Sequence, residues 1–71
     1  MKNDFNEFEV GQEVRLISKD MTKITFGYVD QMLGIGETNE VLWQDGEEVK
    51  LGNRYVGKSY SYHARDLELV K

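Results

Sequence analysis

Short runs of alternating apolar and polar residues, separated by glycine, asparagine and aspartate, recur along this 71-residue chain. Such runs are typical of short β-strands joined by turns, whereas the apolar spacing of an amphipathic helix is poor throughout. The first run, EVRLIS at residues 13–18, places Val14 and Leu16 on one face of a strand. The pattern therefore predicts an all-β chain whose first strand turns these two residues toward the core.

A second run, KITFGYV at residues 23–29, alternates isoleucine, phenylalanine and tyrosine with smaller or polar residues. It predicts a second strand with Phe26 in the core, and Gly27 within it indicates a bulge or a bend. The following stretch, DQMLGIGETN at residues 30–39, has two glycines and no period. We therefore expect a mobile loop there.

The strongest local signal is EVLWQDGEEVKL at residues 40–51. Asp45-Gly46 tolerates the positive φ angles of a type I′ turn, and β-prone residues flank it. A two-residue turn here predicts a hairpin with the cross-strand pairs Gln44 with Glu47, Trp43 with Glu48, Leu42 with Val49, Val41 with Lys50 and Glu40 with Leu51.

This register assigns the two faces of the hairpin. Leu42, Val49 and Leu51 share the core face, whereas Val41 and Trp43 lie on the polar face. A half-exposed tryptophan is therefore expected. Taken with the other runs, the pattern predicts a core of Val14, Leu16, Phe26, Leu42, Val49, Leu51, Leu67 and Leu69.

The C-terminal stretch SYSYHARDLELV, residues 59–70, predicts a strand, a single 3₁₀ turn and a last strand, because HARD breaks the alternation. His63 is expected to bond to the backbone at the start of the turn. Asp66 is expected to cap the turn or to accept backbone N–H bonds. Residues 52–58 form a loop or a second short hairpin that turns at Gly57-Lys58.

FEVGQEVRLI at residues 8–17 and YSYHARDLELV at residues 60–70 resemble the two ends of small SH3-like β-barrel domains of bacteria and phages. Such domains open with aromatic-x-Val-Gly-x-x-Val-Arg and close with aromatic-x-aromatic, a short turn and Asp-Leu-Glu-x-Val. The resemblance covers residues 8–70 and is interrupted by an inserted LGNRYVGK at residues 51–58. It implies a small five-stranded antiparallel SH3-like barrel with a short 3₁₀ turn before the last strand. Proteins of this kind usually bind protein or nucleic acid, and stand-alone phage examples are sometimes inhibitors of host enzymes.

Composition restricts the other possibilities. The chain has no cysteine, which excludes disulfides and thiolate metal sites and suits a reducing cytoplasm. No apolar run has the length of a signal peptide or of a membrane span, so we expect a cytoplasmic protein without membrane contact. Residues 1–7 are expected to be a flexible lead, and residues 8–71 a single domain.

The chain carries few residues suited to catalysis. His63 is the sole imidazole, and Ser59 and Ser61 share its strand face, where neither can form a triad with it. Glu47 and Glu48 are adjacent and therefore lie on opposite faces of a strand. We expect no enzyme, no metal site and no cofactor.

Charge is segregated along the chain, whose net charge is −4. Residues 37–48 carry five acids and no base, and residues 49–65 carry four bases and no acid. Two explanations fit this pattern. Oppositely charged residues on facing strands can form ordinary cross-strand pairs, or a basic, tyrosine-rich patch can lie beside an acidic one.

We therefore predict a non-catalytic module that binds a protein, with nucleic-acid binding through residues 49–65, Lys50 included, as the alternative. Two points stay open: Tyr60 or Tyr62 can instead fill the core, and a loop at residues 52–58 can cover Trp43. The candidate partner-binding residues are Trp43, Arg54, Tyr55, Lys58, Tyr60, Tyr62 and Arg65.

Overall fold

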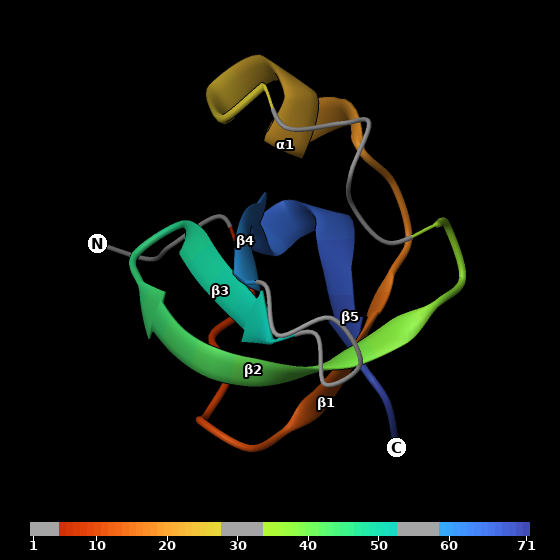
Figure 1. Cartoon of the computed structure of the whole chain (residues 1–71), viewed down its shortest axis with the longest axis vertical. Helices are drawn as coiled ribbons and strands as arrows, with labels where there is room; N and C mark the ends of the chain where they lie inside the picture. The colour runs from red at the N-terminus through yellow and green to blue at the C-terminus, as the bar shows by residue number, and fades with distance from the viewer. Residues whose placement is uncertain (1–4, 28–33, 53–58) are drawn as a thin grey trace.

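Five antiparallel strands, one short helix and one 3₁₀ turn make up the computed structural model, which describes residues 5–27, 34–52 and 59–71 (Figure 1). The strands form one sheet in the order β4-β3-β2-β1-β5. The elements in chain order are β1 (Glu13–Leu16), α1 (Asp20–Thr25), β2 (Thr38–Asp45), β3 (Glu48–Gly52), β4 (Ser59–His63), the 3₁₀ turn η1 (Ala64–Asp66) and β5 (Leu67–Leu69).

The sheet is strongly curved. Its two edge strands, β4 and β5, follow one another in the chain and are joined by the three residues of η1 alone. The sheet must therefore bend until its edges approach, and β2 arcs across the lower part of the molecule in Figure 1. In the described part of the chain β4 does not pair with β5, so the sheet is open. The predicted number of antiparallel strands and the 3₁₀ turn before the last strand are confirmed, whereas the closed barrel is not shown.

The predicted strand at residues 23–29 is wrong over residues 23–27, because α1 occupies its first part; Tyr28 and Val29 lie outside the described residues. Lys19, the residue before the helix, makes no side-chain cap hydrogen bond. The cap comes instead from a distant residue, since the carboxylate of Asp66 accepts the backbone N–H groups of Met21 (3.3 Å) and Thr22 (2.6 Å). A helix needs such acceptors for its first N–H groups. Phe26, predicted in the core, follows the helix and is half-buried.

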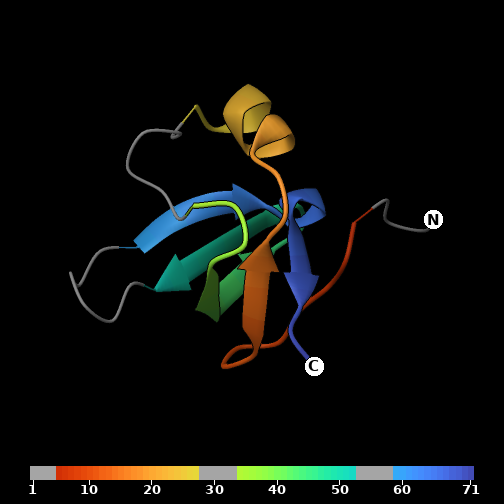
Figure 2. The same ribbon diagram turned by 90° about the vertical axis from the view of Figure 1, so that its right-hand side faces the viewer.

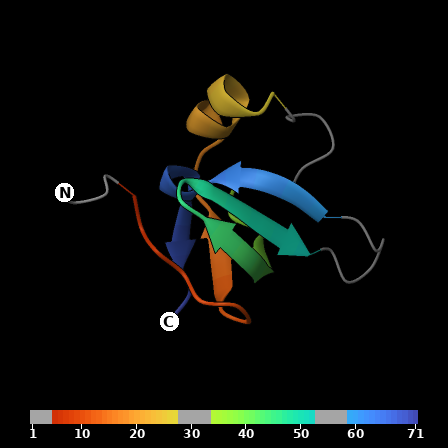
Figure 3. The same cartoon turned by 90° about the vertical axis from the view of Figure 1, so that its left-hand side faces the viewer.

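The helix ends at Thr25, and two residues later Gly27 has a φ angle of +78° and its N–H donates to the Thr22 carbonyl. Glycine adopts this left-handed conformation at little cost, so Gly27 ends a helix rather than forming a strand bulge. Figures 2 and 3 show α1 above β4 and η1, and contacts join it to both. Of the helices that the structure describes, none is long and apolar enough to cross a membrane.

The β2–β3 hairpin turns one residue later than predicted, at Gly46 and Glu47. Gly46 has a φ angle of +63° and Glu47 does not have a positive one, the combination found in a type II′ turn. Trp43 therefore pairs with Lys50 rather than with Glu48. The cross-strand partner of Trp43 is thus two residues farther along β3 than predicted. Because side chains alternate between the faces with a period of two, Trp43 stays on the predicted face.

A bulge at Leu42 then exchanges the faces of two residues. The register shifts between Val41 and Trp43, so that Val41 pairs with Leu51 and turns inward. Val41 is fully buried, whereas Leu42 is 41% exposed. The predicted core position of Leu42 and the predicted polar-face position of Val41 are both wrong for this reason.

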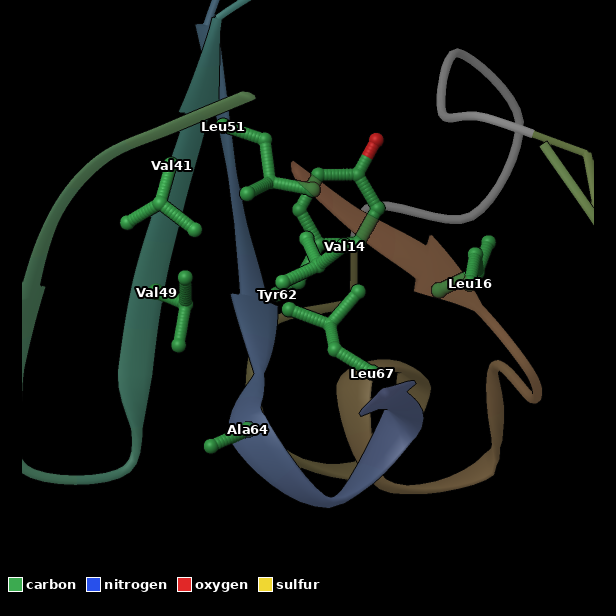
Figure 4. Close-up of a cluster of buried hydrophobic side chains, with 8 residues drawn as sticks. All are labelled: Val14, Leu16, Val41, Val49, Leu51, Tyr62, Ala64 and Leu67. Atoms are coloured by element: carbon green, nitrogen blue, oxygen red, sulfur yellow. The ribbon is translucent and has the colours of Figure 1, made fainter. Parts of the chain in front are cut away.

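The core lies on the concave face of the sheet (Figure 4). Five of the predicted members are buried there, but Leu69 is 38% exposed because it lies near the end of an edge strand. The ring of Tyr62, 2% exposed, occupies the centre of the cluster. The buried cluster consists of Val14, Leu16, Val41, Val49, Leu51, Tyr62, Ala64 and Leu67.

The segment before β1 is attached to the hairpin by backbone hydrogen bonds of Gly11 and Gln12 with Val41 (2.9 and 2.8 Å), and nearer its start by the side chain of Gln44. Gln44 accepts a hydrogen bond from the Phe8 N–H (2.7 Å) and donates one to the Asn6 carbonyl (2.9 Å). These bonds hold the later part of the predicted lead, residues 1–7, against β2. Residues 1–4 lie outside the described residues.

Candidate functional site

The convex face of the β2–β3 hairpin carries the chain's single tryptophan. Trp43 is 39% exposed, as the sequence predicted. Its cross-strand partner Lys50 places its ammonium group 5.7 Å from the centroid of the indole ring. A cation at this distance over a tryptophan face is attracted by the ring's quadrupole. Lys50 therefore adds a cation–π contact to a ring that stays partly exposed.

Leu42 extends this apolar surface. The bulge turns its side chain outward, where it lies across Gly52 of β3. A Cβ atom at Gly52 would lie 2.9 Å from Leu42 Cδ2, so the leucine fills the space that a larger residue would need. The Trp43 patch, as we call it, consists of Leu42, Trp43, Lys50 and Gly52.

Acidic pairs flank the Trp43 patch at both ends. Toward the turn, Asp45 pairs with Glu48, and at the other end Glu40 pairs with Glu13 of β1. Glu48 also accepts a hydrogen bond from Ser61 Oγ (2.5 Å). The outer face of the hairpin therefore presents an apolar strip between two negatively charged ends.

The junction of β4, η1 and α1 forms a second group of polar residues, and this group is buried. Asp66, 1% exposed, accepts the two helix N–H groups and also a hydrogen bond from Ser18 Oγ. Thr22 is fully buried, and its Oγ1 accepts the His63 N–H (3.0 Å). The prediction that Asp66 accepts backbone N–H bonds is confirmed. Through these hydrogen bonds Asp66 anchors α1 to the sheet.

His63 belongs to this junction. Its Nδ1 accepts the Arg65 N–H (3.1 Å), and its Nε2 lies 3.3 Å from Glu47 Oε2. The ring of Phe5 meets the imidazole edge to face, with centroids 6.4 Å apart. Its predicted bond to the backbone at the start of the turn is confirmed. Because both ring nitrogens are engaged and the residue is 3% exposed, neither nitrogen is placed to act as a general base.

The structure separates the predicted partner-binding residues. Tyr62 fills the core, which settles one of the alternatives left open, and Tyr60 is half-buried against the core. Their cross-strand partners Val49 and Leu51 are both buried, so the two tyrosines lie on the face opposite Trp43. Arg65 is exposed in η1. Arg54, Tyr55 and Lys58, together with the predicted loop cover of Trp43, lie outside the described residues.

Leu42 is the site residue that sequence reasoning missed. Its apolar character matched the core pattern, and the bulge that turns it outward depends on how β2 and β3 pair. Nothing in the local sequence marks Leu42 rather than its neighbours as the bulged residue.

Comparison with known proteins identifies no relative of this chain: no protein-family model matches it, and no curated protein or solved structure matches it either. Among the described residues, no group of three or more histidine, cysteine, aspartate or glutamate side chains is placed to hold a metal ion. The geometry of the Trp43 patch is therefore the observation from which a function can be proposed.

Proposed function

We propose that this chain is a non-catalytic module that binds a protein through the Trp43 patch. The observation that carries the proposal is the exposure of Trp43 and Leu42 next to one another on the convex face, while the core is filled from the concave face. Tryptophan is among the residues that most often anchor protein interfaces, and neighbouring exposed apolar side chains mark interaction sites.

We further propose that the sheet is an open form of the SH3-like barrel that the sequence resembles. The short 3₁₀ turn that joins the two edge strands supports this assignment, as does the curvature that it imposes. A module of this kind acts by occupying a partner's surface. The resemblance to SH3-like domains of bacteria and phages implies that the chain inhibits or regulates a host protein in the cytoplasm.

Nucleic-acid binding is the second candidate. The observation in its favour is the Lys50 ammonium group beside an exposed aromatic ring, because cations and stacking rings together bind single strands. The acidic pairs at both ends of the patch oppose it, since phosphates would approach four carboxylates. Protein binding is therefore the better-supported function.

The test compares Trp43→Ala with Ile24→Ala, a control that removes another exposed apolar side chain, on α1. The unsubstituted chain is immobilised, and the proteins that it captures from an extract of the native host are purified. The Kd of each captured protein is then measured with the unsubstituted chain and with each variant. We expect Trp43→Ala to weaken binding by about 2 kcal/mol, a loss of roughly thirtyfold, and Ile24→Ala to leave it unchanged.

Thermal melting completes this test. Because Trp43 is already partly exposed, its removal is expected to shift the Tm by only a few degrees. Equal binding by the two variants would refute the proposal. Unfolding of Trp43→Ala would instead make Trp43 part of the core.

A further inference from the structure

The charges around the Trp43 patch indicate what kind of partner it takes. We propose that the partner presents a basic segment, with lysine or arginine on either side of an apolar anchor, which lies along the patch between the two acidic pairs. This inference rests on the proposed function and adds the chemistry of the bound segment.

The order of side chains along the convex face favours a basic segment. Asp45 and Glu48 lie beyond Trp43 on the side of the turn, and Glu40 and Glu13 lie beyond Leu42 on the other side. A segment that covers the apolar strip must extend over at least one acidic pair. Cationic side chains of the segment are attracted by the carboxylates of these pairs, whereas an acidic segment is repelled by them at both ends of the strip.

The position of Lys50 adds a second, independent observation. Arg15, farther along the same face, is paired with Glu68 (3.0 Å), so Lys50 is the base that the described residues place at the patch itself. Its ammonium group occupies the face of the Trp43 ring. A partner's cation can take this place, because the ring attracts any cation and the flanking carboxylates favour a second one. In the bound state Lys50 then repels the partner.

Lys50 therefore distinguishes the possible partners by the sign of its effect. If the bound segment is basic, removal of the Lys50 charge strengthens binding. If the partner is acidic, or is a nucleic acid, the same change weakens binding, because an attractive charge is lost.

The probe is a display library of random 12-residue peptides without tryptophan, selected on the full-length chain and counter-selected on Trp43→Ala. Enriched peptides are synthesised, and their Kd values are read from the fluorescence of Trp43, the chain's single tryptophan. We expect the enriched peptides to combine basic residues with an apolar one. Their affinity is expected to fall as salt increases.

Three substitutions measure the charge contribution, each with a matched control elsewhere on the surface. Lys50→Met is expected to strengthen binding of the basic peptides by about threefold, the scale of a single exposed charge interaction. Lys23→Met on α1 is its control. Asp45→Asn and Glu40→Gln are each expected to weaken binding by a similar factor, whereas Glu9→Gln, at another exposed acid, leaves it unchanged.

The outcomes separate this inference from the proposed function. Enrichment of neutral or acidic peptides that require Trp43, or weaker binding by Lys50→Met, would overturn the basic-segment inference and leave protein binding through Trp43 standing. Absence of any peptide that requires Trp43 would overturn both. Tighter binding of a single-stranded oligonucleotide than of any selected peptide, with loss on Lys50→Met, would assign the patch to nucleic acid.

Discussion

The outer face of the β2–β3 hairpin and the junction of β4, η1 and α1 use similar residues in opposite ways. Both bring together an aromatic or imidazole ring, acidic groups and a strand. At the junction, Asp66, Thr22 and His63 are buried, and each is hydrogen-bonded within the chain. At the hairpin, Trp43 and Leu42 stay partly exposed to solvent.

This difference separates structural from candidate functional residues. A buried polar group that finds all its partners inside the chain contributes to the fold, and its loss leaves donors without acceptors. An exposed apolar side chain contributes little to the fold and is available to a partner. His63 and Asp66, which with Arg65 form the polar cluster that stands out in the sequence, are therefore structural residues at this junction.

The largest expected effect is at the junction. Asp66→Ala removes the acceptor of the Met21 and Thr22 N–H groups and of the Ser18 hydroxyl. We expect it to lower the free energy of unfolding by about 3 kcal/mol, because buried donors are left unsatisfied. Urea denaturation followed by circular dichroism measures this change.

Asp45→Ala is the matched control for Asp66→Ala, since it removes an exposed aspartate from the hairpin. It is expected to cost less than about 0.5 kcal/mol, as surface substitutions usually do. Equal losses for the two variants would mean that Asp66 does not fasten α1 to the sheet.

A smaller effect tests the two sides of the hairpin. Val41→Ala is expected to destabilise the protein by about 2 kcal/mol, because it opens a cavity in a packed core. Leu42→Ala removes a larger side chain but is expected to cost less than about 1 kcal/mol, since that side chain is partly solvated. The same denaturation experiment compares them. A larger loss for Leu42→Ala would show that the bulge is absent and that the faces are exchanged.

The smallest effect concerns a polar contact on the outer face. Arg15 and Glu68 form an ion pair of 3.0 Å between β1 and β5, with both side chains more than two-fifths exposed. Arg15→Ala is expected to change the free energy of unfolding by less than about 1 kcal/mol, because solvent and salt screen exposed pairs. A loss as large as that of Asp66→Ala would mean that the edge strand β5 depends on this pair.

Several parts of the fold could be predicted from the sequence because their determinants are local. Alternation at residues 13–18 predicted β1 and the burial of Val14 and Leu16, and the break at HARD predicted η1. The half-exposed state of Trp43 also followed from the alternation in the hairpin, even though the predicted turn was one residue early.

The tertiary structure decided the rest, because the determining contacts join residues far apart in the chain. The helix α1 depends on Asp66, which lies 44 residues after Thr22 and supplies the acceptors that Lys19 does not. The bulge at Leu42 depends on how β2 pairs with β3. Local alternation sets which residues can share a face, but the free energy of burying a side chain or pairing a polar group depends on the neighbours that folding brings to it.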